Sequence, residues 1–328
     1  MSVEIFAILR ALKQCLPGFS FASVREFGDA DWRFPKGRSK TRMADIFSDV
    51  REAAGWRDKV FKAGASETLC AYPILRHFLE VVTPCSCIQK ERASFIAACR
   101  VVDLMQAAKS GQCRLAVPAL KRAVRVFFQR HLQAYGQELV RPKHHYMLHM
   151  TRQAEEDGFW LDCFVHERKH QLIKDASQSI TNTRNFEKAS LATVLTKTME
   201  NLSGISGTGL VQPCARSPEL SAAFGAPSEV AQQLRFDYMY VSVGDLLFIG
   251  DAACIVEACV LVGSTLALLV NRLGLLERPS DTSSRWARTT EKDLLEMAAG
   301  FVHAACWYYR GDGSMIALGT PPLPAQSE

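Results

Sequence analysis

The sequence lacks the long apolar runs and the N-terminal signals that direct a chain to or through a membrane. Its best candidate span, 258–270, contains a Gly-Ser turn and stops short of the roughly 20 residues that cross a bilayer. Glu4 precedes the first apolar run, and Arg10 and Lys13 soon follow it, which is not the pattern of a secretory signal. We therefore expect no membrane partner and a nuclear or cytoplasmic location.

Features of several other protein classes are also missing. The eleven cysteines are an odd number without framework spacing, which argues against a disulfide scaffold and for reduced thiols. There is no glycine-rich phosphate loop, no internal repeat and no Ser-His-Asp arrangement with readable spacing. Cys85-x-Cys87 has no second pair at zinc-finger spacing, so it is a poor metal site.

The composition is that of a folded protein of ordinary polarity. The chain has 328 residues, of which 48% are hydrophobic and 22% charged, and this is enough for two domains with a substantial core. The net charge of +5 is mild. It permits a nucleic-acid partner without requiring one, because basic residues must be concentrated to form a binding surface.

The N-terminal 60 residues are expected to hold one helix and a basic loop. An amphipathic helix over about 3–15 ends at Pro17-Gly18, and a loop follows over 25–45. Five basic residues lie within ten positions of this loop beside Trp32 and Phe34: Arg33, Lys36, Arg38, Lys40 and Arg42. Such a loop can grip a phosphate backbone and stack on a base. The alternative is a solvated loop anchored by its two aromatic residues.

From 66 to 136 the apolar residues recur at three-and-four spacing, which predicts three core-facing helices. Pro73 predicts a kink in the first helix. The third lies between Pro118 and Gly136 and carries Lys121, Arg122, Arg125 and Arg130 on one side. This basic face is a candidate phosphate track, although a solvated surface is the favoured explanation.

Histidines crowd the segment from Arg141 to Lys188, which holds five of the eight in the chain: His144, His145, His149, His166 and His170. We expect a helix over about 143–156, a turn at Asp157-Gly158 and a second helix over about 162–177. Antiparallel packing would bring His144, His145, His149, Glu167 and His170 together. Cys163-x-x-His166 with His145 and His149 would make four zinc ligands, and plain burial of these side chains is the alternative.

Beyond residue 203 the composition and the spacing of the apolar residues change. The stretch 203–232 is rich in Gly, Ser, Pro and Ala and is expected to be a linker. From 233 to 318, β-branched and aromatic runs separated by Gly-Asp and Gly-Ser turns predict a small β-barrel, with a helix near 290–300. The predicted class is therefore α+β, with 1–60 as an N-terminal piece, a helical domain at 61–202, the linker, the β-rich domain and a tail at 319–328.

Several short motifs of the histidine-rich segment resemble a known protein family. They are Pro142-Lys143-His144-His145, Leu148-His149, Glu167-x-Lys169-His170 and Asn185-Phe186. This series is similar to the later part of eukaryotic cut-and-paste transposases of the CACTA-like and plavaka-like elements, and of proteins derived from them. The similarity is specific over these 50 residues, and it extends more faintly over 64–200 and to the β-rich tail. His166 and Glu187-Lys188 depart from the family pattern.

The resemblance implies the C-terminal half of an RNase H-like core, in which two Asp and one Glu hold divalent metals. Glu167 matches the position of that Glu and is the candidate catalytic residue and Mg²⁺ ligand. The reaction needs three carboxylates because two metal ions, roughly 4 Å apart, must act on the attacking and leaving oxygens. The Asp motif of the family is not found before residue 140, so Mg²⁺ is expected only if the site is completed elsewhere.

Two classes of function remain. The first is a transposon-derived fragment that binds DNA without cutting it, and the second is a structural or protein-interaction module with partners on its β-rich domain. The candidate nucleic-acid-binding residues are Arg38, Lys40, Arg42, Lys143, His144, His145, Arg168, Lys169, His170 and Lys174.

Overall fold

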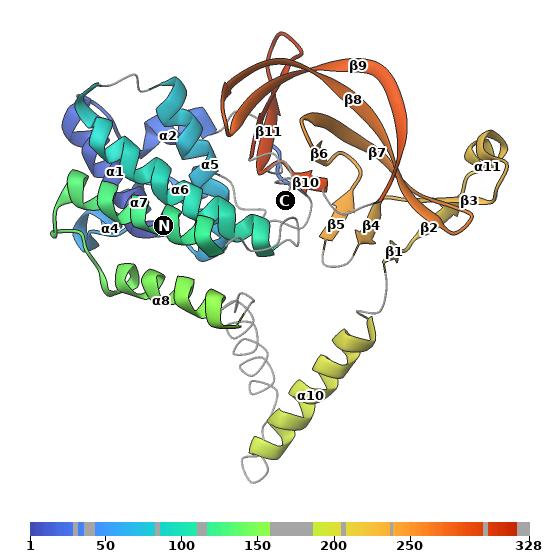
Figure 1. The fold of residues 1–328 in the computed structure, drawn as a ribbon, viewed down its shortest axis with the longest axis horizontal. Helices are drawn as coiled ribbons and strands as arrows, with labels where there is room; N and C mark the ends of the chain where they lie inside the picture. The colour runs from blue at the N-terminus through green and yellow to red at the C-terminus, as the bar shows by residue number, and fades with distance from the viewer. Residues whose placement is uncertain are drawn as a thin grey trace.

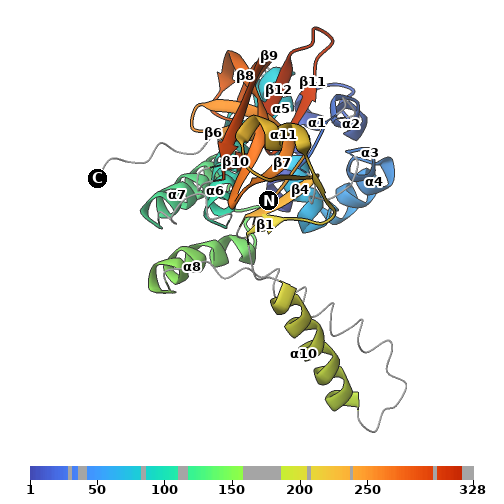
Figure 2. The ribbon, with the colours of Figure 1, turned by 90° about the vertical axis from the view of Figure 1, so that its right-hand side faces the viewer.

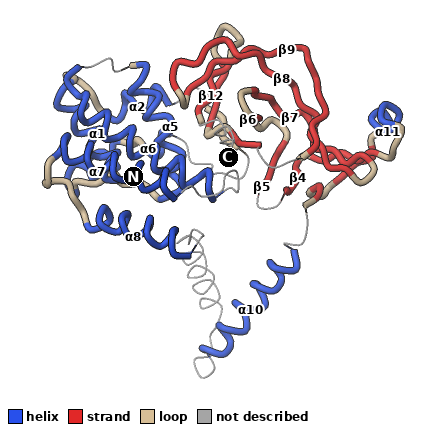
Figure 3. Tube along the Cα trace, viewed as in Figure 1, coloured by secondary structure: helices blue, strands red, loops and turns tan. Residues whose placement is uncertain are grey.

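The computed structural model describes residues 1–28, 32–35, 43–82, 86–109, 117–157, 186–204, 208–236, 239–297 and 301–319. Helices fill the N-terminal part and an antiparallel, curled sheet forms the C-terminal part (Figures 1 and 3). The predicted α+β class is confirmed. Among the described residues, no helix combines the length and the apolar composition that a membrane span requires.

The helices of the N-terminal part follow the predicted periodicity. They are α1 (Ser2–Cys15), α2 (Phe21–Gly28), α3 (Met43–Ile46), α4 (Asp49–Asp58), α5 (Ala65–Val81), the 3₁₀ turn Ser86–Ile88, α6 (Gln89–Lys109), α7 (Val117–Tyr135), α8 (Pro142–Asp157) and α10 (Phe186–Gly204). Pro73 lies inside α5, and Gly136 takes a left-handed φ of 59° directly after α7. A glycine adopts this conformation without steric cost, which is why the helix ends there.

Helix α1 is the centre of the helical core and not a separate N-terminal piece. Its side chains from Ile5 to Leu9 are all buried, and it packs against α6. Residues of α2, α3 and α5 belong to the same hydrophobic cluster. The predicted boundary at 60 therefore runs through one core, because the first sixty residues supply buried side chains that the later helices cover.

The C-terminal part is a curled sheet with short strands around it. The strands are β1 (Gly209–Leu210), β2 (Cys214–Arg216), β3 (Ser228–Ala231), β4 (Gln233–Phe236), β5 (Met239–Ser242), β6 (Leu246–Ile249), β7 (Ala252–Val262), β8 (Thr265–Ser280), β9 (Ser283–Glu296), β10 (Phe301–His303), β11 (Cys306–Tyr309) and β12 (Met315–Leu318). The main sheet has the order β10-β6-β7-β8-β9-β12-β11, and β3 pairs with both β7 and β2. Register shifts in β7–β8 and β8–β9 accompany the curl seen in Figure 1.

Two expectations for this region differ from the structure. The stretch 203–232 is not a plain linker, because β3 within it pairs with β7 from Ser228↔Val262 to Ala231↔Cys259 and the short helix α11 (Pro218–Phe224) precedes it. The helix expected near 290–300 is instead the end of β9, where Val270↔Asp293 and Leu268↔Leu295 pair with β8. Main-chain pairing with a long neighbouring strand outweighs the helix-forming composition there.

The helical part and the sheet share one core. Cys306, Ile316 and Leu318 of β11 and β12 lie in the hydrophobic cluster of the helices, next to α5. Polar contacts cross the same interface between the helical part and the sheet, which we call the seam. The Ser280 hydroxyl donates to Glu80 at 3.1 Å. The two parts are thus packed together. In Figures 1 and 2, α10 points away from both.

The aromatic residues of the predicted basic loop are part of this seam. The indole N–H of Trp32 donates to the Phe27 carbonyl at 3.3 Å, and its ring lies 4.5 Å from that of Tyr308. Arg33 forms an isolated antiparallel bridge with Trp307 of β11. Trp32 therefore has an anchoring role, which agrees with the solvated-loop interpretation for this residue.

Candidate functional site

The structure places the predicted site residues in three different situations. Arg38, Lys40, Arg42, Glu167, Arg168, Lys169, His170 and Lys174 lie outside the described residues, as do Cys163 and His166. Lys143 lies in the first turn of α8. His144 and His145 are adjacent on α8 but have opposite environments. The predicted convergence on Glu167 thus lies outside the described residues, and of its five members only the histidines of α8 are described.

His144 points into the protein. It is 5% exposed, and its ring centre lies 4.6 Å from that of His131 on α7. Its Nδ1 accepts a 3.2 Å hydrogen bond from the backbone N–H of Arg141, just before the helix. Pro142 begins α8, and His144 thus reaches back to cap the first turn as the acidic residue of a capping box does. Burial, followed by the charge of His131, lowers the pKa of His144 to about 4.

His131 is fully buried and is held by an acid from α1. Its Nδ1 lies 2.5 Å from Oε1 of Glu4, and the other carboxylate oxygen of Glu4 accepts a 3.0 Å hydrogen bond from the hydroxyl of Ser94 on α6. Glu4, Ser94 and His131 are at most 1% exposed. Four helices, α1, α6, α7 and α8, thus each contribute one side chain to a buried polar cluster, which we call the Glu4–His131–His144 cluster.

Among the described residues, this cluster is the set of three ligating side chains whose ligand atoms lie within 4.8 Å of one another. Two of its three donors are imidazoles, which suit zinc and related ions better than magnesium. The set therefore does not fit the Mg²⁺ that the transposase resemblance implies, and Glu167 is not part of the described structure. No catalytic step can be assigned to a Mg²⁺ site here.

The sequence predictions did not include this cluster, although the sequence carries a signal for it. His131 continues the buried stripe of α7 formed by Leu120, Val124 and Phe127, so a polar residue occupies a core position. Glu4 likewise begins the apolar run of α1. A lone buried polar residue requires a partner, and two of them on different helices could have been paired with each other.

His145 and His149 form a second, exposed pair on the outer side of α8. Their Nε2 atoms are 2.9 Å apart, at the i, i+4 spacing that aligns side chains on one face of a helix. His144 turns inward to His131, whereas His145 and His149 are exposed, so the three histidines of α8 do not converge on one point.

Exposed arginines meet at the seam between the two parts. The Cζ atoms of Arg33 and Arg288 lie 5.0 and 5.3 Å from the ring centre of Tyr309, and Nη2 of Arg288 donates to the Tyr309 hydroxyl at 2.8 Å. In the described ranges, no carboxylate lies within ion-pairing distance of either guanidinium. We call Arg33, Arg288 and Tyr309 the arginine–tyrosine cluster.

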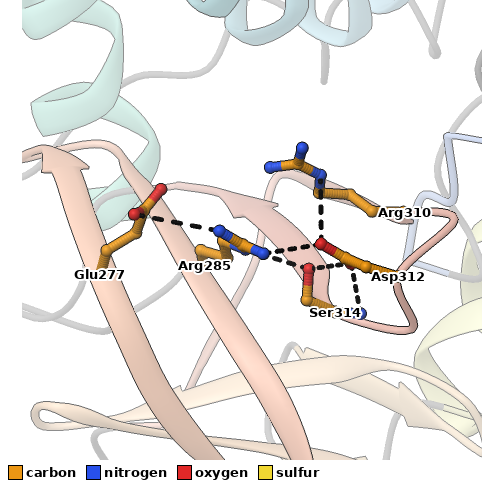
Figure 4. A network of polar contacts seen from close by, with 5 residues as sticks. All are labelled: Glu277, Arg285, Arg310, Asp312 and Ser314. Atoms are coloured by element: carbon orange, nitrogen blue, oxygen red, sulfur yellow. Dashed lines mark hydrogen bonds and ion pairs between the residues drawn. The ribbon is translucent and has the colours of Figure 1, made fainter.

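In a neighbouring network of the same sheet, by contrast, the arginine side chain is paired with a carboxylate (Figure 4). Arg285 of β9 donates to Asp312 at 2.7 Å and to the Ser314 hydroxyl at 3.0 Å, and Asp312 also accepts from the backbone N–H of Ser314 at 2.9 Å. Arg310 lies 4.0 Å from the same carboxylate. This network fixes the turn between β11 and β12 and leaves little free charge.

Helix α7 carries a second group of exposed arginines. Arg122, Arg125 and Arg130 are exposed and have no ion pair with a described carboxylate, whereas Lys121 on the same helix pairs with Glu155 of α8. The basic face predicted for this helix is therefore present, and three of its four charges are not neutralised within the described structure.

Comparisons of this chain with family models, with curated proteins and with solved structures found no match.

Proposed function

We propose that this chain is a transposon-derived, transposase-like protein that binds nucleic acid through exposed arginines and does not cleave it. The motifs of 141–188 supply the transposase part of this proposal. The binding part rests on one observation, the arginine–tyrosine cluster at the seam.

Arg33 and Arg288 suit a phosphate ligand because no described carboxylate pairs with them and both lie against one tyrosine ring. Each guanidinium lies against the Tyr309 ring, so less conformational freedom is lost on binding than for a freely moving side chain. A planar guanidinium donates two parallel hydrogen bonds to a phosphate. Arg33 also leads into the basic loop, in which Arg38, Lys40 and Arg42 follow in sequence.

A non-cleaving role follows from the ligand chemistry. Phosphodiester cleavage by two metal ions needs several hard oxygen ligands. The ligating cluster of the described residues has two imidazoles and one carboxylate, and Glu167 is a single carboxylate in a segment that the structure does not describe. Binding needs only the positive charge.

The test is a fluorescence-anisotropy titration of single-stranded and duplex DNA and of RNA, repeated at several salt concentrations. The double variant Arg33→Ala/Arg288→Ala should weaken binding and make the log–log salt slope shallower by about 1 to 2, because each phosphate contact contributes close to one. Arg272→Ala is the matched control, since this exposed arginine of the sheet is already paired with Asp293 at 3.0 Å. No binding of the wild type at low salt, or equal losses in both variants, would refute the proposal.

A second candidate function is that of a protein-interaction module, and α10 favours it. Leu191 and Leu195 are 61% and 52% exposed and lie one turn apart on this helix. Exposed apolar residues in an i, i+4 row form a surface that a partner helix can cover. A complex that is lost in Leu191→Glu/Leu195→Glu, together with absent nucleic-acid binding, would favour this function over the first.

A further inference from the structure

Two buried polar atoms beside the Glu4–His131–His144 cluster have no hydrogen-bond partner among the residues that the structure describes. They are Nε2 of His131 and the hydroxyl of Tyr135, whose ring centre lies 5.2 Å from that of His131. Leaving a buried polar atom unpaired costs about 1 to 3 kcal/mol. Such atoms in a native protein require an explanation, and a bound ion is one that the chemistry of this cluster allows.

The orientation of the His131 ring indicates what kind of ligand this cluster could bind. When the ring is neutral and its Nδ1 donates the proton to Glu4, Nε2 carries a lone pair and no hydrogen. A histidine whose one nitrogen is held by a carboxylate while the other is free has the arrangement found around metal-bound histidines.

His144 supplies a second imidazole at the right place. Its ring centre is 4.6 Å from that of His131, and the ligand atoms of the cluster all lie within 4.8 Å of one another. Two ligands of one tetrahedral zinc ion are about 3.4 Å apart, given bonds of about 2.1 Å. The ligand atoms of the cluster are therefore close enough for a rearrangement of the two histidine side chains to bring both rings to one ion.

We infer that the Glu4–His131–His144 cluster is a binding site for a transition-metal ion of the zinc class. His131 Nε2 and His144 Nε2 bind the ion directly, and Glu4 is a positioning residue that fixes the tautomer of His131. Imidazole donors select zinc, cobalt, nickel or copper over magnesium and calcium. This site is independent of the nucleic-acid proposal and of Glu167.

The inference predicts a local change at the start of α8. For Nε2 of His144 to bind an ion, its proton must move to Nδ1, which then no longer accepts the 3.2 Å hydrogen bond from Arg141 N–H. Metal binding should therefore speed hydrogen exchange at the Arg141 amide. A purely structural histidine cluster would not respond to zinc in this way.

The experiment uses the full chain stripped of metal by a chelator. Zinc is added while the thermal midpoint is followed, and cobalt is added while its visible absorption reports tetrahedral nitrogen coordination. We expect one equivalent per chain, a raised midpoint and faster exchange at Arg141. His144→Gln should abolish all three responses, and Glu4→Gln should weaken binding about 10- to 100-fold.

The exposed pair of α8 provides the control. His145→Ala/His149→Ala removes a surface chelate of similar spacing and should leave the stoichiometric site intact. Circular dichroism verifies that each variant is folded, and Ser94→Ala serves as a second, milder change because it removes only the hydroxyl that Glu4 accepts from. Absence of a one-to-one response in the wild type, or its loss in the His145/His149 variant with retention in His144→Gln, would overturn the inference.

Discussion

The helical core contains a buried ion pair. Arg76 of α5 and Asp103 of α6 are joined at 2.8 Å with side chains only 5% and 7% exposed, and the hydroxyl of Tyr72 donates to the same carboxylate at 2.8 Å. Burial lowers the pKa of Arg76, but the charges of Asp103, Cys99 and Tyr72, together with the hydrogen bond to Asp103, raise it overall. Removal of either partner would leave the other charge buried and unpaired, which destabilises the folded protein.

Asp103→Asn should therefore destabilise the protein by about 3 to 5 kcal/mol, because it leaves a buried guanidinium without a counter-charge. Chemical denaturation measures the change. Asp49→Asn is the control, since Asp49 pairs with Arg25 at the surface and such pairs contribute little. Similar effects of the two substitutions would contradict the burial argument.

The contribution of Asp312 to the stability of the folded protein depends on pH in the acid range. The Ser314 hydroxyl, followed by its backbone N–H and Arg285, lowers the pKa of Asp312 from 3.8 to about 2. A carboxyl group whose pKa falls on folding stabilises the native state above its unfolded pKa, and this contribution is lost as the pH falls toward the folded value. The stability difference between wild type and Asp312→Asn should thus shrink as the pH falls from 5 to 3 in thermal unfolding scans. A constant difference across that range would contradict the assignment.

At the scale of elements, we expect the packing of β11 and β12 against the helices to make the two parts unfold together. Ile316 of β12 is 4% exposed within the hydrophobic cluster of the helices. Ile316→Ala should cost about 2 to 5 kcal/mol and shift the loss of helix and the loss of sheet together. Circular dichroism follows the helices, and the fluorescence of the buried Trp286 and Trp307 follows the sheet when Trp32, Trp56 and Trp160 are replaced by Phe in both proteins. Leu276→Ala, at an exposed position of β8, is the control. Separate transitions would show that the two parts are independent domains.

The elements that the sequence predicted well are those with a strong local period. The stripe Leu120, Val124 and Phe127 was sufficient to place α7, and α1 was placed to within a residue. The elements that were missed depend on distant partners. Residues 290–296 are strand because β8 pairs with them, and 228–231 are strand because β7 does. His131 and Glu4 are 127 positions apart, so the polar residue in each apolar stripe indicates that a partner is needed, while the identity of the partner depends on how the helices pack.

At the scale of the whole molecule, positive charge is distributed over two described surfaces, the arginine–tyrosine cluster and the exposed face of α7. If these and the basic segments at 36–42 and 168–174 engage about five phosphates, the log–log salt slope for duplex DNA should be near −4 to −5. A slope near zero with measurable affinity would point to a non-ionic mode of binding.

Cleavage is the second property of the whole molecule, and we expect none. Labelled duplex incubated with Mg²⁺ or Mn²⁺ should remain intact, because a lone carboxylate binds Mg²⁺ weakly. Glu167→Gln should then behave as the wild type. Metal-dependent nicking that this substitution abolishes would show that further carboxylates complete an active site.

The bridge between Arg33 and Trp307 also bears on aggregation. Arg33 N–H donates to Trp307 O at 2.7 Å and Trp307 N–H donates to Arg33 O at 2.9 Å, so the outward main-chain groups of Trp307 on β11 are occupied. An open strand edge is a template for pairing with a second chain. The segment 32–35 thus shields the last strand of the sheet from edge-to-edge association. A polyanion that drew Arg33 off this edge would expose it, which links occupancy of the arginine–tyrosine cluster to the colloidal stability of the protein.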